Sequence, residues 1–120
     1  MNTEDLEKYA AAWNAHDIDT IMEMMTEDCI FLTGGGTDHW GTRFEGADVV
    51  RERFVEVWTD IPDVHFRNGR HFAQGDRGCS HWTLCGTRTD GTVVEVDGCD
   101  LFEFAHGKIR VKDSYIKIKR

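Results

Sequence analysis

GDRGCSHWTLCGTRTDGTVVEVDGCDLFEFAHGKIRVKDSY, the stretch from Gly75 to Tyr115, decides the fold of this chain. Three turn sequences divide it, namely Gly75-Asp76, Asp90-Gly91 and His106-Gly107. Glycine in such dipeptides adopts the positive φ that tight hairpin turns require. The residues between the turns are rich in valine, threonine, cysteine and aromatic side chains. The stretch therefore predicts consecutive antiparallel strands joined by hairpins.

The turn at Asp90-Gly91 predicts the register of the two central strands. As a two-residue loop, it pairs the two flanking threonines. Continuing this pairing brings His81 opposite Asp100, and both share a face with Phe102 because side chains alternate with a period of two. A histidine and a carboxylate on an apolar interior face indicate acid/base chemistry in a pocket.

The two outer turns extend this pair into a row of polar residues. Pairing across the first turn brings Arg70 beside His81. Pairing across the third turn nominally brings Asp113 beside Asp100. The predicted row across four strands is therefore Arg70, His81, Asp100 and Asp113.

The last strand contains a change of pattern. Its apolar residues fall at odd positions near Ile109 and at even positions near Ile116. Such a switch is typical of a β-bulge, which inserts one extra residue into a strand. The sequence therefore leaves open whether Asp113 or Ser114 faces the interior.

Helical periodicity and capping signals place three helices ahead of these strands. Thr3 and Asp17 are N-cap candidates for the first two helices, and Pro62 ends the third. The expected elements are helices over 3–15, from 17 onward and over 46–59, a strand over 29–33, an irregular segment over 33–45, and strands and turns from 64 to the end.

The order of these elements predicts one α+β domain over residues 1–120. The economical packing wraps a cone-shaped, curved antiparallel sheet around the three N-terminal helices and leaves one interior pocket. The opposite sheet face carries Trp82, Leu84 and Leu101 among charges, which predicts a homodimer interface. The residues expected to line the pocket and bind its ligand are Trp13, Trp40, Phe44, Phe54, Phe66, Phe72, Phe102 and Tyr115.

Charge and composition argue against several partners and sites. The formal net charge is −8 and no basic stripe interrupts it, so neither nucleic acid nor a membrane surface is an expected partner. No apolar stretch has spanning length and no basic leader precedes the first helix, so a cytoplasmic protein is expected. The four cysteines lack C-x-x-C spacing and are expected to be reduced thiols. His39 beside Asp38 has no further ligand at a recurrent spacing, so we expect neither a metal nor a cofactor.

Three segments carry a resemblance to a known superfamily: Trp13 to Asp17, Gly86 to Gly91 and Asp100 to Ile109. Together with the order of elements, they resemble the nuclear transport factor 2-like superfamily, particularly its SnoaL-like and ketosteroid isomerase-like branches. The resemblance covers nearly the whole chain. It implies a fold that hosts isomerases, dehydratases, cyclases, epoxide hydrolases and proteins without catalysis.

The resemblance also implies roles for single residues. Asp100 matches a pocket aspartate that is an oxyanion-hole acid in the isomerases and a general acid/base in the polyketide cyclases. Tyr9 falls near the tyrosine of the first helix that donates to the oxyanion. Where the isomerases keep their proton-abstracting aspartate, this chain has Thr33, which cannot act as a base at neutral pH. The resemblance therefore argues against a steroid isomerase.

The leading interpretation is a cofactor-independent enzyme that moves a proton next to a carbonyl or hydroxyl group of a small, largely apolar molecule. The reaction would be isomerisation, dehydration or cyclisation, with His81 and Asp100 moving the proton and Tyr9 or Arg70 stabilising the oxyanion. One alternative is a hydrophobic-ligand-binding or dimeric scaffold protein, in which the polar row is structural. A second is epoxide hydrolysis by a water held between Asp100, Arg70 and Asp113, which requires both aspartates to face inward.

Overall fold

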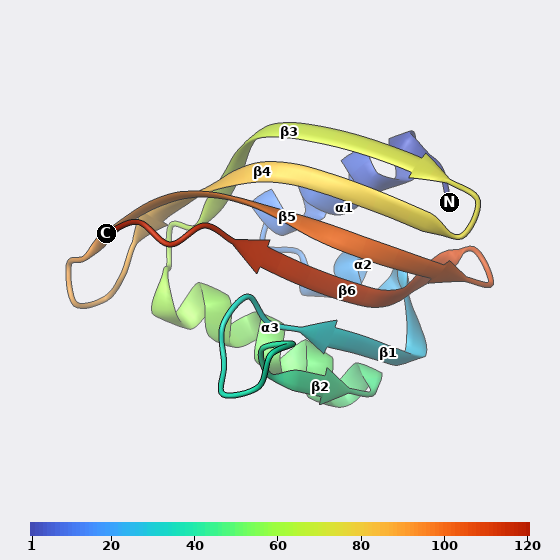
Figure 1. Cartoon of the computed structure of the whole chain (residues 1–120), viewed down its shortest axis with the longest axis horizontal. Coiled ribbons are helices and arrows are strands. Elements are labelled where there is room, and N and C mark those ends of the chain that lie inside the picture. The colour runs from blue at the N-terminus through green and yellow to red at the C-terminus, as the bar shows by residue number, and fades with distance from the viewer.

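The computed structural model describes all residues from Met1 to Arg120. It confirms the predicted α+β order, with three helices and six strands (Figure 1). A short strand lies in the segment expected to be irregular, and the first strand begins at Met25 rather than Cys29. The elements are α1 (Thr3–Asn14), α2 (Ile18–Glu23), β1 (Met25–Leu32), β2 (Arg43–Glu45), α3 (Ala47–Asp60), β3 (His65–Gln74), β4 (Arg77–Thr87), β5 (Val93–Ala105) and β6 (Lys108–Ile116).

Side-chain caps fix where the first two helices begin. The side chain of Asn2 accepts a hydrogen bond from the backbone N–H of Asp5, and the Asp5 carboxylate accepts one from the backbone N–H of Asn2, both at 2.9 Å. This reciprocal pair satisfies two N–H groups that have no partner within α1. The N-cap of α1 is therefore Asn2, whereas the sequence predicted Thr3. Asp17 caps α2 as predicted and accepts from the N–H of Thr20.

The six strands form one sheet in the order β2-β1-β6-β5-β4-β3. The pair β1 and β6 is parallel and the other neighbours are antiparallel, so the sheet is mixed instead of wholly antiparallel. The sheet curves, and the helices lie on its concave side (Figure 1). Because α1 contacts β3 and α3 contacts β1, the helices cover both ends of the curve.

The hydrophobic core lies between the helices and the concave face. Aromatic rings meet there edge to face, with centroids 4.8 Å apart for Trp13 and Phe54 and 5.0 Å apart for Phe31 and Phe54. Such pairs stabilise the core beyond the area they bury. The residues with no exposed surface include Leu6, Ile21, Cys29, Val50, Phe54 and Ile109.

The hairpin between β4 and β5 closes with a longer loop than the sequence predicted. Arg88 donates its N–H to the carbonyl of Thr92, and Gly91 donates to the carbonyl of Arg88. Three residues therefore form the loop, with Gly91 at a φ of 89°. The loop is also attached to the end of α3, because Thr89 donates to the carbonyl of Asp60 and Arg88 forms an ion pair with its carboxylate.

The longer loop shifts the register by one residue, so the predicted pairing of His81 with Asp100 is wrong. Asp100 lies opposite Ser80, and His81 lies opposite Cys99. A slip of one residue turns every side chain of a strand to the other face. Trp82 therefore faces the helices, although it was assigned to the outer face.

The same shift turns much of β3, whose pairing with β4 was predicted correctly. Arg70 pairs with His81 and Gln74 with Arg77, as expected. Paired residues of neighbouring strands point to the same face of a sheet. Arg70 and Phe72 therefore lie, like their partners on β4, on the outer face, which is the face turned away from the helices. Phe72 is 66% exposed and is no part of the interior.

The predicted bulge in β6 is confirmed. Phe104 pairs with Ile109, whereas Glu103 pairs with Val111, so one extra residue is inserted between the two pairs. Ser114 then lies opposite Asp100 and faces the interior. The open choice between Asp113 and Ser114 is thus settled in favour of Ser114.

None of the helices combines the length and the apolar character that a membrane span needs. The four cysteines are free thiols, as predicted. Cys29 and Cys85 are buried, and Cys79 and Cys99 are half-buried.

Candidate functional site

A cavity of about 430 Å³ lies between α3 and the concave face of the sheet. Its volume falls within the range of roughly 300–1,000 Å³ that is usual for small-molecule sites. A second cavity of about 40 Å³ adjoins the same side chains from the side of α1 and could hold water. The residues common to both cavities are Trp13, Phe66, Trp82, Asp100 and Lys112.

Asp100 is the centre of the polar groups in the large cavity. Its side chain is 5% exposed, and three donors surround its carboxylate. Trp82 Nε1 and Lys112 Nζ each donate to Oδ2 at 2.9 Å, and Ser114 Oγ donates to Oδ1 at 2.5 Å. A buried carboxylate is tolerated only when it is paired and hydrogen-bonded in this way.

Lys112 is the functional candidate that the sequence analysis missed. Its ammonium lies 5.3 Å from the ring centre of Tyr9, 5.2 Å from that of Trp13 and 5.6 Å from that of Phe102. These rings provide cation–π contacts in place of water. The signal available in the sequence was the bulge, because inserting one residue after Ile109 turns Lys112 inward.

A glycine makes room for the tryptophan that holds Asp100. Gly98 lies opposite Trp82 across the two central strands. A Cβ at Gly98 would come within 2.6 Å of the Trp82 ring and of the Tyr115 carbonyl oxygen. Only glycine therefore lets this indole lie across β5 with its N–H pointing at Asp100.

Tyr9 lies under the ion pair but does not line the large cavity. It is 3% exposed, and its hydroxyl donates to the sulfur of Met25 at 3.5 Å. Burial raises the pKa of the Tyr9 phenol well above its ordinary value. Tyr9 can therefore act only as a neutral donor, and only toward the smaller cavity.

A row of polar residues crosses four strands, as predicted, but Asp100 is the only predicted residue in it. His71, Ser80, Asp100 and Ser114 lie opposite one another on β3, β4, β5 and β6. His71 Nδ1 and Ser80 Oγ are 2.7 Å apart. Burial lowers the pKa of the His71 imidazole. The predicted row had the right direction across the sheet but the wrong side chains on three of its strands.

The other predicted catalytic residues lie on the outer face. His81 is half-buried there, and its Nδ1 has no hydrogen-bond partner. Asp113 lies opposite Leu101 and accepts a hydrogen bond from the Tyr115 hydroxyl at 3.3 Å. Burial raises the pKa of the Asp113 carboxyl. Arg70 is exposed beside His81, so none of these three side chains meets Asp100 in the cavity.

Only some of the predicted lining residues contact the cavities. Trp13 and Phe66 line both, and Phe102 lines the smaller one. Phe54 is wholly buried in the core and Phe44 is half-buried, with its ring stacked 6.4 Å from that of Phe31.

Three predicted lining residues are mainly exposed, and neither cavity includes them. Trp40 is 45% exposed in the segment that precedes β2, and Tyr115 is 53% exposed beside Asp113. Phe72 is the third, for the register reason given above. No group of three histidine, cysteine or acidic side chains is placed to hold a metal ion.

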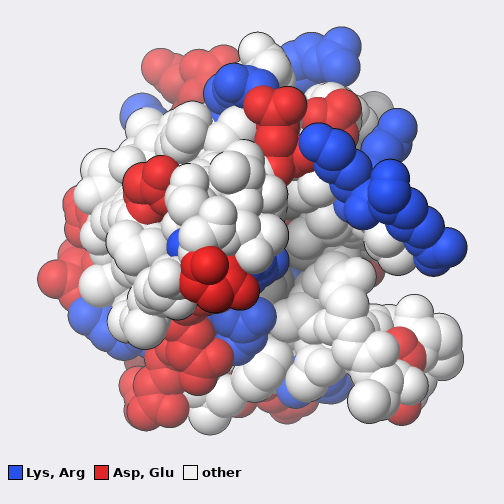
Figure 2. Space-filling view, turned by 90° about the vertical axis from the view of Figure 1, so that its left-hand side faces the viewer, with Lys and Arg blue, Asp and Glu red and all other residues white.

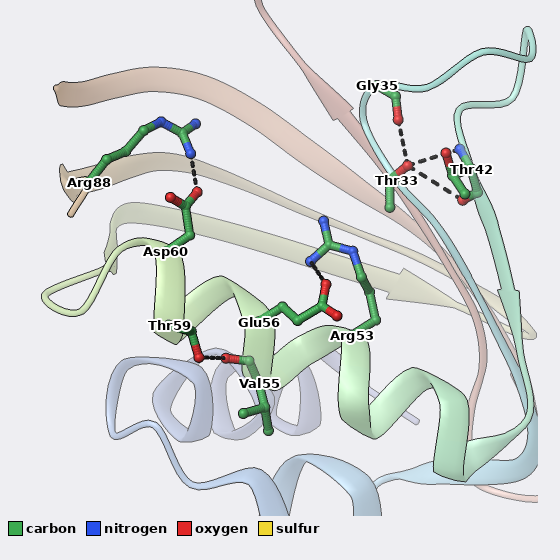
Figure 3. A network of polar contacts seen from close by, with 9 residues as sticks. All are labelled: Thr33, Gly35, Thr42, Arg53, Val55, Glu56, Thr59, Asp60 and Arg88. Atoms are coloured by element: carbon green, nitrogen blue, oxygen red, sulfur yellow. Dashed lines mark hydrogen bonds and ion pairs between the residues drawn. The ribbon is translucent and has the colours of Figure 1, made fainter. Parts of the chain in front are cut away.

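Charged residues of α3 and of the β4–β5 hairpin form the rim of the large cavity. Figure 3 shows Asp60 at the end of α3 paired with Arg88, and Arg53 rising from α3 toward the sheet. Seen from this end of the molecule, Figure 2 shows acidic and basic side chains of both signs around a recessed, largely uncharged area.

Thr33 also lines the large cavity and holds the segment after β1 closed. Its hydroxyl donates to the carbonyl of Gly35 at 2.6 Å and accepts from the N–H of Thr42 at 2.9 Å (Figure 3). The single O–H of Thr33 is therefore donated to the backbone of this segment.

The model of the SnoaL-like domain matches residues 6–111. The chain belongs to the SnoaL-like family. No curated protein matches the sequence. The family match confirms the predicted relation to the nuclear transport factor 2-like superfamily, and the structure confirms the predicted α+β fold.

Solved structures of low sequence identity share the fold of this SnoaL-like protein. A protein of unknown function with a cystatin-like fold from Xanthomonas campestris is 21% identical, with a TM-score of 0.83 over 98% of this chain and 92% of that chain. A putative polyketide cyclase from Pseudomonas putida is 20% identical, with a TM-score of 0.83 over 97% and 91%. A hypothetical protein with a ketosteroid isomerase-like fold from Catenulispora acidiphila, in complex with trimethylamine, is 18% identical, with a TM-score of 0.79 over 96% and 86%.

Proposed function

We propose that this SnoaL-like protein is a cofactor-independent enzyme that transfers a proton next to a carbonyl or hydroxyl group of a small, largely apolar molecule. The reaction class is isomerisation, dehydration or cyclisation. The observation that carries the proposal is a buried carboxylate, Asp100, at the wall of a cavity of about 430 Å³ that also presents the aromatic rings of Trp13, Phe66 and Trp82.

The hydrogen bonds of Asp100 leave one position for the reaction. Oδ2 accepts from both Trp82 and Lys112, whereas Oδ1 accepts only from Ser114. Each carboxylate oxygen has about two acceptor positions, so Oδ1 retains one. In the proposed mechanism, Oδ1 removes a proton from the substrate and returns it at a second atom.

Lys112 would stabilise the oxyanion that forms when the proton leaves. It lines the large cavity beside Asp100, whose carboxylate uses one of the three N–H donors of the ammonium. Donors that are already oriented in a site with little water stabilise developing negative charge strongly. Lys112 thus takes the role that the sequence analysis gave to Tyr9 or Arg70.

Ligand binding without catalysis is the second candidate. It is favoured by the three donors around Asp100, because an ion pair with satisfied hydrogen bonds is also a stable structural element. Epoxide hydrolysis of the kind considered above is not proposed, because Arg70 and Asp113 face away from Asp100.

Exchange of carbon-bound protons tests for the proposed chemistry without a known substrate. Wild-type protein should speed the loss of α-protons from β-tetralone or acetophenone in D₂O, followed by NMR. Asp100→Asn should reduce this acceleration by about 10²–10⁴-fold, the usual contribution of a general base. The matched control is His81→Ala, which removes the originally expected base from the outer face and should leave the rate unchanged.

A variant that fails to fold must not be mistaken for one that fails to react. Circular dichroism should show that Asp100→Asn is folded under the assay conditions. The double variant Asp100→Asn with Lys112→Met removes both charges together and should also be inactive. Undiminished exchange in a folded Asp100 variant contradicts the proposed base, and no acceleration by wild type with any ketone favours the binding protein.

We further propose that the protein forms a homodimer through the outer sheet face. Three large apolar side chains are exposed on this face, namely Phe72 at 66%, Leu101 at 39% and Tyr115 at 53%. Their exposure supports the proposal that a second copy of the chain covers this face. Sedimentation equilibrium should then give about twice the chain mass of 13.8 kDa. Leu101→Arg should shift the protein to one chain mass, and a wild type that is monomeric at all concentrations contradicts the proposal.

A further inference from the structure

One arginine at the cavity has no hydrogen-bond partner within the protein. Arg53 lines the large cavity from α3, and its side chain is 28% exposed. Its guanidinium carbon lies 5.7 Å from the ring centre of Phe44. The nearest carboxylate oxygen, Oε2 of Glu56, is 3.8 Å from Nη1, which is longer than a hydrogen bond.

The other two cations of the cavity wall are already engaged. Lys112 donates to Asp100 at 2.9 Å, and Arg88 donates to Asp60 at the end of α3. The wall therefore holds two close ion pairs and one loose one. Arg53 is the cation of this wall that donates no hydrogen bond within the protein, so all of its donors remain available to a bound molecule.

Glu56 offers little competition for the guanidinium. Its side chain is 70% exposed, and it pairs with Arg53 across one turn of the helix. Exposed pairs of this kind contribute little to stability, so Glu56 can turn toward water at small cost. A ligand carboxylate, in contrast, would meet the planar fork of Arg53 with two parallel hydrogen bonds.

The position of Arg53 complements that of Asp100. Arg53 belongs to α3 at the rim, whereas Asp100 and Lys112 belong to the sheet on the other wall, and both groups line the same cavity. Aromatic side chains, including Trp13, Phe66 and Trp82, lie along the cavity wall. The cavity thus suits a molecule with an apolar body, a reactive oxygen at the sheet and an anionic group at the helix.

We propose that Arg53 binds a carboxylate of the substrate, so that the substrate class is a largely apolar carbonyl or hydroxyl compound that also carries a carboxylate. This inference rests on the proposed function, because it names the substrate of the same cavity. The net charge of −8 does not attract anions from a distance, so selection of an acid depends on this local contact.

Paired neutral and charged probes test the inference by binding alone. Benzoate and benzamide have the same shape, and their dissociation constants follow from ¹H–¹⁵N chemical-shift titration of cavity residues. Wild type should bind benzoate about tenfold or more tightly than benzamide, as hydrogen bonds to a charged group allow. Arg53→Gln should reduce this ratio to about one.

Two further variants on α3 sharpen the result. Arg51→Gln is the matched control, because Arg51 pairs with Asp19 and does not line the cavity, and it should keep the wild-type ratio. Glu56→Gln removes the competing carboxylate and should tighten benzoate binding severalfold. If the preference for benzoate disappears in Arg88→Gln but persists in Arg53→Gln, Arg88 binds the carboxylate and the proposal is overturned.

The failure of this inference can be told from failure of the proposed function. Equal binding of benzoate and benzamide by wild type overturns the role of Arg53, while the ketone exchange assay still measures the chemistry of Asp100. Absence of binding by both probes also contradicts the inference.

Discussion

Lys112→Met is expected to lower the free energy of unfolding by about 3–5 kcal/mol, as removal of one partner from a buried ion pair does. The reason is that Asp100, at 4% exposed, would keep the hydrogen bonds from Trp82 and Ser114 but lose the only cation beside it. Urea unfolding at neutral pH, followed by tryptophan fluorescence, measures the change.

A double-mutant cycle shows whether the loss belongs to the pair. Asp100→Leu should cost a similar amount, because the ammonium of Lys112 would then lie unpaired among aromatic rings. The double variant Asp100→Leu with Lys112→Met should recover most of the stability, since neither charge remains. If the two single losses simply add in the double variant, the ion pair is not the unit that this structure indicates.

Phe54→Ala is expected to destabilise the protein by about 3–5 kcal/mol, as deletion of a wholly buried aromatic ring does. Phe54 has no exposed surface, and its ring contacts those of Trp13 and Phe31. The shift in the urea midpoint at constant slope gives the value.

Phe72→Ala is the matched control for this large loss. Phe54 and Phe72 were both predicted to line the pocket, but Phe72 is 66% exposed on the outer face. Its replacement in the monomer should change the free energy of unfolding by no more than about 0.5 kcal/mol. Equal losses in the two variants would mean that β3 faces the other way.

Local signals predicted the elements of this fold because they are properties of neighbouring residues. The cap at Asp17, the stop before Pro62 and the turns at Gly75 and Gly107 each depend on a few residues. The order β6-β5-β4-β3 needed no more than short connections between consecutive hairpins, whereas the parallel pairing of β1 with β6 was not predicted. The bulge in β6 was visible as a change of apolar parity.

The register of the central hairpin could not be predicted because a distant segment decides it. A two-residue loop and a three-residue loop are both compatible with Asp90-Gly91. The longer loop allows Thr89 and Arg88 to contact Asp60 at the end of α3, nearly thirty residues earlier. With the longer loop, Ser80 and not His81 lies opposite Asp100.

The partner of Asp100 was missed for a related reason. Lysine is rarely buried, so Lys112 gave no expectation of an interior position. Its burial depends on the place of the bulge together with the aromatic rings of α1 and β5. The parity change indicated a bulge but not its exact place, and the packing of the rings depends on segments distant in the sequence.

The place of β6 between β1 and β5 couples two parts of folding. The β1–β2 pair joins the β3–β5 meander within the sheet only through β6. Lys112 belongs to this strand, so its docking also brings Asp100 its counter-ion. Closure of the sheet and neutralisation of its buried charge are thus one event.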